Sequence, residues 1–238
     1  ELVDTSIKKL NIKKLFIDSY EEKRTSSGFT NLGANTAIKE KLEDGVLLIN
    51  YTGHGGELGW TDEQVFTVND IKKMKNRNRL PLFMTATCEF SRFDNPEHKS
   101  AGEYLLTQAQ GGAIGLFTTV RLVFSIPNFK LNETFYKVLE SSINNSEIRL
   151  GDVFKRTKTT NNGGTNDRNF TLLGDPALKL GFPLNNSIVD EITINNQQSD
   201  TIKSLNEGVI RGHISNINND LLENYNGWAE VLIFDKVK

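Results

Sequence analysis

Two apolar stretches run into polar loops: Val46-Leu47-Leu48-Ile49-Asn50-Tyr51 leads into Thr52-Gly53-His54-Gly55-Gly56-Glu57, and Leu82-Phe83-Met84-Thr85-Ala86 leads into Thr87-Cys88-Glu89-Phe90-Ser91. Short apolar runs without alternation are typical of strands that are buried on both faces of a sheet. If the two strands are parallel neighbours, His54 and Cys88 emerge at the same edge, beyond the carboxyl ends of the strands.

The same alternation of strand and helix patterns extends outward along the chain. Further apolar runs occur at 15–17 and 113–117, and amphipathic segments lie between and after the runs. Helices are predicted at 33–44, 67–76, 128–143 and 147–159, and Gly45 ends the first of these. A further helix is predicted to begin at a capping box of Ser100 and Glu103 and to end at Gly111-Gly112. This order predicts the α/β class, with a parallel sheet flanked by helices.

The character of the sequence changes after Pro183. Asn-rich turns separate alternating runs at 188–194, 209–214 and 229–234, which predict antiparallel strands. We therefore expect two units, 1–182 and 183–238. The second is expected to be only part of a β-sandwich, because these strands are too few to close one.

Composition narrows the possible functions. The 238 residues are 37% apolar and 24% charged, so a folded core is expected, and a net charge of −2 gives no electrostatic basis for binding nucleic acid. No run approaches the ~20 apolar residues that span a bilayer. The single cysteine excludes an internal disulfide, and no spaced metal motif is present. Position 1 is not Met and no signal peptide precedes it, so we expect a piece of a longer protein.

His54 and Cys88 form a candidate pair for thiol catalysis. A neighbouring imidazole acts as general base and lowers the pKa of the thiol. Gly55 lets a substrate carbonyl approach the backbone, and the N–H groups of Gly55 and Cys88 are the expected oxyanion donors. Alone, the glycine-rich loop could be a tight turn or a phosphate cradle, and a lone cysteine is commonly a small buried residue. The occurrence of both at strand ends favours catalysis.

Other residues near the same edge are candidates for supporting roles. The expected substrate contacts are Thr52, Gly53, Ala86, Thr87, Arg121 and Phe124. Arg121 could bind an acidic group of the substrate, or pair structurally with Glu89 or Glu57. Glu89 and Asp94 are either structural or could ligate calcium together with loop carbonyls, and the sequence leaves both open. His98 is expected to be solvated, and His213 lies on a strand of the second unit.

Together these loops resemble the gingipain (C25) family of cysteine peptidases and, within it, the sortase branch of the type IX secretion system. The resemblance extends over roughly residues 12–182. Besides the two loops, similar stretches occur at 67–70, 100–103, 111–114, 118–124, 132–135 and 170–176.

The resemblance implies a caspase-like α/β fold, followed by the start of an immunoglobulin-like module near Pro183, with His54 and Cys88 as the catalytic pair. It implies an endopeptidase that removes C-terminal secretion signals from exported cargo, at the outer membrane or cell surface or after secretion. Transfer of the cargo to a lipopolysaccharide anchor through a thioester could follow. Cargo proteins and other secretion components would be its partners, and no cofactor would be required.

One departure from the family concerns the residue that orients the histidine. In gingipains an acidic residue from chain upstream of this segment does so, and Glu57 is the nearest substitute here, with Glu89 beside the thiol. The segment alone could therefore fold yet be inactive.

Two other function classes remain open. A catalytically silent caspase-like scaffold could bind secretion-system subunits, although it would need neither His54 nor Cys88. A nucleotide-binding α/β domain is the third class, but no phosphate-binding fingerprint follows the first strand.

Overall fold

The computed structural model describes residues 10–25, 28–61, 63–143, 148–162, 164–183, 185–199, 201–202 and 205–228. The chain divides into two compact units, Glu1–Gly181 and Phe182–Lys238, and each is described by itself. None of the helices in these ranges is long and apolar enough to cross a membrane.

The first unit is built on a four-stranded sheet with the order β3-β7-β8-β9. Its strands are β3 (Leu48–Thr52), β7 (Leu82–Ala86), β8 (Gly115–Thr119) and β9 (Phe170–Gly174). The first three are parallel, as predicted, whereas β9 runs antiparallel to β8 at the edge. Both β7 and β8 are buried at every residue, which explains their unbroken apolar character.

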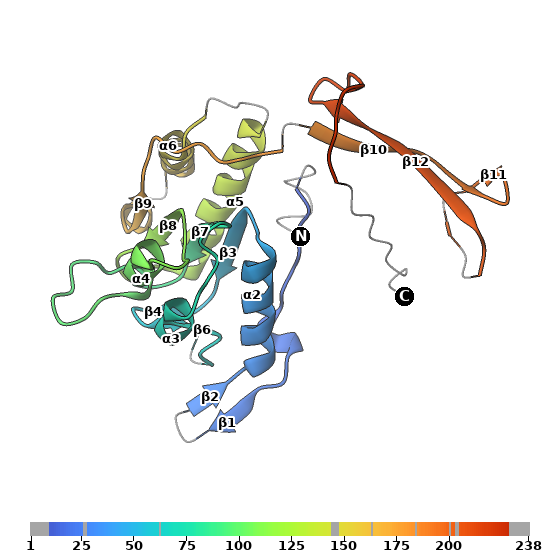
Figure 1. Ribbon diagram of the computed structural model, residues 1–238. Coiled ribbons are helices and arrows are strands. Elements are labelled where there is room, and N and C mark those ends of the chain that lie inside the picture. The colour runs from blue at the N-terminus through green and yellow to red at the C-terminus, as the bar shows by residue number, and fades with distance from the viewer. Residues whose placement is uncertain are drawn as a thin grey trace. The chain divides into compact units, whose positions relative to one another are not determined.

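Helices cover both faces of this sheet (Figure 1). They are α2 (Leu32–Asp44), α3 (Val68–Lys72), α4 (Ala101–Thr107), α5 (Ser125–Ser142), α6 (Leu150–Asn161) and α7 (Thr165–Arg168). The predicted α/β class, with helices around a sheet that contains parallel strands, is therefore confirmed.

Adjacent residues of β8 show how the two faces are filled. Leu116 belongs to the core that includes side chains of α2, α3 and α4. Phe117 points to the other face, where its ring lies 5.6 Å from Phe135 of α5 and 4.6 Å from Phe154 of α6. Neighbouring residues of a strand alternate between faces, so one strand anchors both helix layers.

Local capping signals set several helix ends. Gly45 follows α2 with a φ of 91°, a value that favours glycine, as predicted. Ser100 and Glu103 form the predicted capping box of α4. That helix nevertheless ends at Thr107, before the predicted Gly111-Gly112, and α3 is shorter than the predicted 67–76.

The prediction of a strand at 15–17 is wrong. Ile17–Ser19 form a 3-10 turn, η1, in which the Ser19 hydroxyl donates a hydrogen bond of 2.7 Å to the Phe16 carbonyl. Phe16 is 65% exposed. Three apolar residues are too few to define a buried strand when a local hydrogen bond favours a turn.

Three smaller strand pairings occur in the described part of the first unit. β1 (Lys23–Thr25) pairs antiparallel with β2 (Gly28–Thr30), and β4 (Gly55–Gly56), β5 (Gly59–Trp60) and β6 (Phe66–Thr67) form a small antiparallel sheet. The β4–β5 hairpin directly follows His54, so it fixes the chain on one side of the candidate site.

The second unit is an antiparallel sheet of β10 (Asn185–Ile194), β11 (Gln197–Gln198) and β12 (Gly208–Asn216). The predicted strands at 188–194 and 209–214 are confirmed. The predicted strand at 229–234 lies outside the described residues. The immunoglobulin-like identity of this unit stays a prediction.

Candidate active site

His54 and Cys88 follow neighbouring strands at the same edge of the sheet. β3 and β7 are parallel, and their register pairs Thr52 with Ala86. Each candidate residue comes two positions after that pair. The predicted juxtaposition of the two strand ends is therefore present.

The two loops contact each other directly beyond the strands. Gly55 packs so closely on Thr87 that a Cβ at Gly55 would lie 2.6 Å from Thr87 Oγ1 and 2.9 Å from the Gly59 carbonyl oxygen. Only glycine fits between them without a shift. The residue after His54 thus touches the residue before Cys88.

The backbone at His54 is held by two hydrogen bonds to its carbonyl oxygen. The Tyr51 hydroxyl donates one at 2.6 Å and the Thr61 N–H donates the other at 2.9 Å. Tyr51 stacks on Trp60 at 4.3 Å, and burial raises the pKa of its phenol well above the usual range. The imidazole of His54 is exposed and has no hydrogen-bond partner within the described ranges.

The hairpin geometry determines where the Gly55 N–H points. Thr61 donates to the His54 carbonyl, so these two residues occupy a hydrogen-bonded position of the β4–β5 ladder. The next pair, Gly55 and Trp60, is then a non-bonded pair, because the two kinds alternate in an antiparallel ladder. The Gly55 N–H therefore points away from β5.

The loop that carries Cys88 is fastened to the end of β8. The N–H of Glu89 donates to the Arg121 carbonyl at 3.3 Å, and the N–H of Ser91 donates to the Thr119 carbonyl at 2.9 Å. The Thr119 hydroxyl also donates to the Thr87 carbonyl. Glu89 has a φ of 51°, a left-handed conformation that turns the chain sharply after the cysteine.

Cys88 itself is partly buried. Its thiol lies 3.6 Å from the Val123 carbonyl oxygen, to which it donates. The Cys88 N–H has no partner among the residues described. The thiol is thus bordered by its own loop and by the chain that leaves β8.

Buried hydroxyl groups stabilise the loop that carries Cys88. Thr118 Oγ1 lies 2.8 Å from both Thr85 Oγ1 and Ser91 Oγ, and all three residues are fully buried. A Cβ at Gly102 would lie 1.7 Å from Ser91 Oγ, so α4 packs against the same point. Buried hydroxyls that satisfy one another favour a single arrangement of the chain.

A salt-bridge cluster connects the histidine hairpin with the cysteine loop. Glu57 accepts from Arg92 at 3.2 Å, from Asn95 at 2.8 Å and from His98 at 2.9 Å. Arg92 also pairs with Glu89 at 3.3 Å. The carboxylate of Glu57 is therefore engaged by residues of the cysteine loop. His98 is exposed, as predicted, and in addition pairs with Glu57.

Arg121 pairs with Asp94 rather than with Glu89 or Glu57, so the predicted partners are wrong. Both Nη atoms of Arg121 donate to the Asp94 carboxylate, which lowers the pKa of Asp94. The two carboxylates considered as calcium ligands, Glu89 and Asp94, are thus each paired with an arginine. No group of three His, Cys, Asp or Glu residues that could hold a metal occurs in the described part of the chain.

The predicted substrate contacts fall into two groups. Thr52, Gly53, Arg121 and Phe124 are exposed. Ala86, the last residue of β7, and Thr87, which packs on Gly55 of the hairpin, are each only 1% exposed, so their side chains offer no surface to a substrate.

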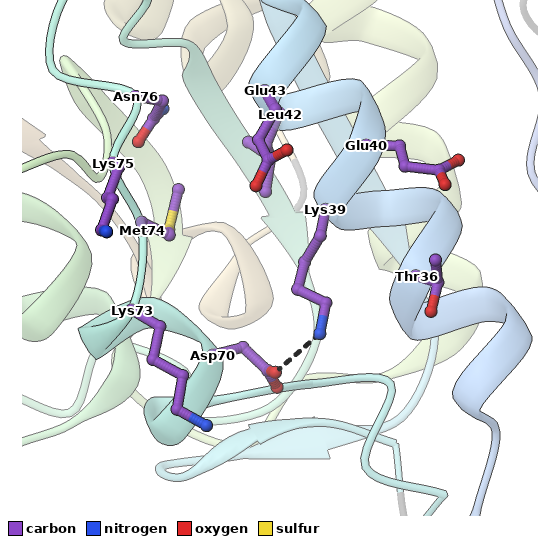
Figure 2. A pocket seen from close by; sticks show the side chains of 10 residues that line it. All are labelled: Thr36, Lys39, Glu40, Leu42, Glu43, Asp70, Lys73, Met74, Lys75 and Asn76. Carbon is purple, nitrogen blue, oxygen red and sulfur yellow. Dashed lines mark ion pairs between the residues drawn. The ribbon is translucent and has the colours of Figure 1, made fainter.

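A groove of about 370 Å³ lies between α2, α3 and the chain that follows α3 (Figure 2). Figure 2 shows the ion pair of Lys39 and Asp70, 3.6 Å apart, between the two helices. Asp70 also accepts from Thr67 in the capping box of α3. None of the residues that line the groove belongs to the loops of His54 or Cys88, and its Lys39–Asp70 pair has a structural explanation in the contact between the two helices.

Sequence reasoning missed three residues that position the loops: Tyr51, Arg92 and Asn132. Asn132 of α5 donates to Thr52 Oγ1 at 2.8 Å and exchanges hydrogen bonds with Asn50. A polar residue on the buried face of a helix was an available signal for Asn132. No local signal marks the long-range partners of Arg92.

Comparisons with known proteins identify the family and support the fold. Peptidase family C25 matches over residues 1–181. Gingipain R (RGPB), whose structure is described as that of an Arg-specific cysteine proteinase, gives a TM-score of 0.55 at 20% identity, over 66% of this chain and 39% of that one. A complex of the pro- and mature domains of RgpB from Porphyromonas gingivalis gives 0.54 at 18% identity, over 69% of this chain and 47% of that one.

A third solved structure, described as "Structure of Protease", gives a TM-score of 0.52 at 13% identity, over 79% of this chain and 50% of that one. No curated protein sequence matches the chain. The likeness to the solved structures concerns the fold, and the chain spans half or less of their lengths. Because the family match covers most of the sequence, the chain belongs to peptidase family C25.

Proposed function

We propose that the protein containing this chain is a cysteine endopeptidase, with Cys88 as nucleophile and His54 as general base. The supporting observation is the parallel pairing of Thr52 with Ala86, which brings both residues to one edge of the sheet. In addition, Gly55 contacts Thr87, so the loops that carry His54 and Cys88 also touch beyond the ends of the strands. Base and nucleophile on adjacent loops are what thiol catalysis requires.

In the proposed reaction, His54 takes the proton of the Cys88 thiol and the sulfur attacks the scissile carbonyl carbon. Collapse of the tetrahedral intermediate breaks the C–N bond, and His54 returns the proton to the leaving amine. The resulting thioester is then attacked by water or by another amine, and His54 removes a proton from that attacking group. Collapse of this second tetrahedral intermediate breaks the C–S bond, and the Cys88 sulfur leaves as a thiolate that takes the proton back from His54. The chemistry needs no metal or cofactor, since both groups are side chains of this chain.

The oxyanion of that intermediate would be bound by the N–H groups of Gly55 and Cys88. The Gly55 N–H points away from β5, the partner strand in its hairpin, and the Cys88 N–H has no partner in the described ranges. Donors that are already oriented stabilise the developing charge without reorganisation.

The test is the reactivity of Cys88 in the full-length protein. Iodoacetamide is expected to label Cys88 faster than it labels a free model thiol at pH 7, and His54→Ala is expected to remove that advantage. Cys88→Ala should abolish peptide cleavage while the circular dichroism spectrum stays unchanged. Labelling no faster than the model thiol would overturn the proposal.

We further propose that the enzyme acts as PorU does, the sortase of type IX secretion, and that it removes C-terminal signals from exported cargo at the outer membrane or cell surface. This rests on the sequence resemblance at the His54 and Cys88 loops. A thioester intermediate supports either hydrolysis or transfer to an amine. Mass spectrometry of cargo products, with and without an added amine acceptor, distinguishes these outcomes. Absence of cargo cleavage by the folded full-length protein would instead favour a silent scaffold.

A further inference from the structure

Large apolar side chains are exposed on the chain that leaves β8. Leu122 is 64% exposed, Phe124 73%, Ile126 71% and Phe129 54%. We refer to these four residues as the apolar wall. Scattered single apolar residues are normal on a protein surface, but several large ones in one short segment indicate a binding surface.

The apolar wall lies on chain that contacts both candidate catalytic loops. At its beginning, the Val123 carbonyl accepts from the Cys88 thiol at 3.6 Å. Just beyond its end, Asn132 donates to Thr52 Oγ1 at 2.8 Å, two positions before His54. The segment between these contacts therefore runs from the nucleophile toward the strand end that carries the base.

Hydrogen bonds hold the apolar wall in place without burying it. The Phe124 N–H donates to Asn166 Oδ1 at 2.9 Å, and Asn169 donates to the Leu122 carbonyl at 2.8 Å. Asn166, which is 8% exposed, also donates to Asn128 of α5 at 3.1 Å. A preformed apolar surface binds an apolar group without an ordering cost.

The charged groups around the thiol are already paired. Glu89 pairs with Arg92, and Arg121 and Asp94 pair with each other. Glu57 accepts from Arg92, Asn95 and His98. To pair with Glu57, Glu89 or Asp94, a cationic substrate side chain would have to break one of these ion pairs, whereas an apolar side chain would meet the wall directly.

On the basis of the proposed function, we infer that the enzyme prefers a large apolar residue as the donor of the scissile carbonyl. The apolar wall would bind that side chain while Cys88 attacks its carbonyl. This selectivity differs from the arginine specificity that is stated for gingipain R.

The inference is tested on the full-length protein with three peptides that differ only in the residue that donates the carbonyl: Leu, Phe or Arg. We expect kcat/KM for the Leu and Phe peptides to exceed that for the Arg peptide by about tenfold or more, as apolar contacts allow. Phe124→Ser should remove most of that difference. Phe16→Ser, which changes an equally exposed phenylalanine elsewhere in the unit, should leave it unchanged.

Iodoacetamide labelling separates this inference from the proposed function. The reagent has no side chain that must bind to the apolar wall, so its rate reports only on the Cys88 thiol. If Phe124→Ser keeps rapid labelling but loses the apolar preference, the inference is supported. Preference for Arg, or an apolar preference that Phe124→Ser leaves intact, would overturn it while the cysteine mechanism stands. If Phe124→Ser lowers the stability of the folded protein and leaves the ratio of kcat/KM values unchanged, the wall is covered by another part of the protein and the inference is wrong. Slow labelling of the unmodified protein would overturn the proposed function itself.

Discussion

Gly55 and Thr87 touch so closely that the residue after the candidate base and the residue before the candidate nucleophile form one packing unit. A Cβ at Gly55 would lie 2.6 Å from Thr87 Oγ1, closer than real Cβ contacts allow. Thr87 Oγ1 is buried without a hydrogen-bond partner in the described residues. The two loops can therefore lie this close together only because Gly55 has no Cβ.

Gly55→Ala is therefore expected to push the two loops apart. We expect the free energy of unfolding to fall by about 1–3 kcal/mol, which is the usual cost of overpacking a tight contact. Iodoacetamide labelling of Cys88 should slow as well. Gly56→Ala is the matched control, because a Cβ at Gly56 would meet nothing within 4 Å. Equal effects of the two substitutions on labelling would contradict this account.

The hydroxyl of Tyr51 is expected to fix the backbone of His54. Tyr51→Phe removes the 2.6 Å hydrogen bond to the His54 carbonyl and keeps the stack on Trp60. Because Thr61 still donates to that carbonyl, the loss in stability should be about 0.5–1.5 kcal/mol. Denaturant unfolding measures it.

The pKa of Tyr51 sets a second expectation for the same residue. Burial raises this pKa, so the phenol stays neutral and keeps donating throughout the range in which the enzyme can be assayed. The difference in stability between Tyr51→Phe and the unmodified protein should therefore be the same at pH 6 and at pH 9. A difference that disappears by pH 9 would show that the phenol ionises and that the account of its burial is wrong.

Arg92 is expected to act as a positioning residue, since it pairs with Glu57 on one loop and Glu89 on the other. In Arg92→Met, labelling of Cys88 at pH 7 should fall about tenfold, because small displacements of reacting groups are costly. Arg92→Lys keeps the charge and should recover part of the rate.

Arg211→Met is the control for Arg92, because Arg211 also pairs with a glutamate, Glu191, at 2.9 Å in the second unit. It should leave the rate of labelling at pH 7 unchanged. A labelling rate for Arg92→Met that matches the unmodified protein, at equal or lower stability, would reduce Arg92 to a structural role.

The sequence predicted the sheet and its two functional loops because both depend on local signals. The run before Cys88 is largely apolar because β7 is covered on both faces, whereas β3, which precedes His54, is an edge strand that is only partly buried. The capping box of Ser100 and the glycine after α2 are likewise signals within a few residues. Where the pattern was short, as at 15–17, a local turn replaced the predicted strand.

The parts of the site that the sequence did not predict depend on contacts between distant residues. Arg121 pairs with Asp94 and not with the acidic residues nearest the catalytic motifs, because the turn at Glu89 directs the following chain toward the end of β8. Glu57 lies three positions after His54, yet its carboxylate turns to Arg92, Asn95 and His98. Side-chain directions of this kind follow from the folded loops and leave no mark on sequence spacing.

The Arg121–Asp94 pair yields a prediction with a definite pH dependence. The pKa of Asp94 is lowered by Arg121, so the pair stabilises the fold above the pKa of an unfolded aspartate, about 3.9, and that contribution is lost as the pH falls through the lower folded value. The difference in Tm between Asp94→Asn and the unmodified protein should be largest near neutral pH and shrink below pH 4. Since both side chains are solvent-exposed, added salt should reduce it as well.

The same substitution should also change substrate choice, because it frees the Arg121 guanidinium beside the apolar wall. We expect Asp94→Asn to improve cleavage of peptides that carry a glutamate near the scissile bond, relative to otherwise identical glutamine peptides. Asp152→Asn is the control: Asp152 pairs with Arg149 on α6 at 2.9 Å, and Arg149 likewise lowers its pKa. It should reproduce the pH-dependent loss of stability without the change in substrate choice. If both variants shift the substrate ratio equally, the effect reflects overall charge and the ion pair beside the thiol plays no part in selectivity.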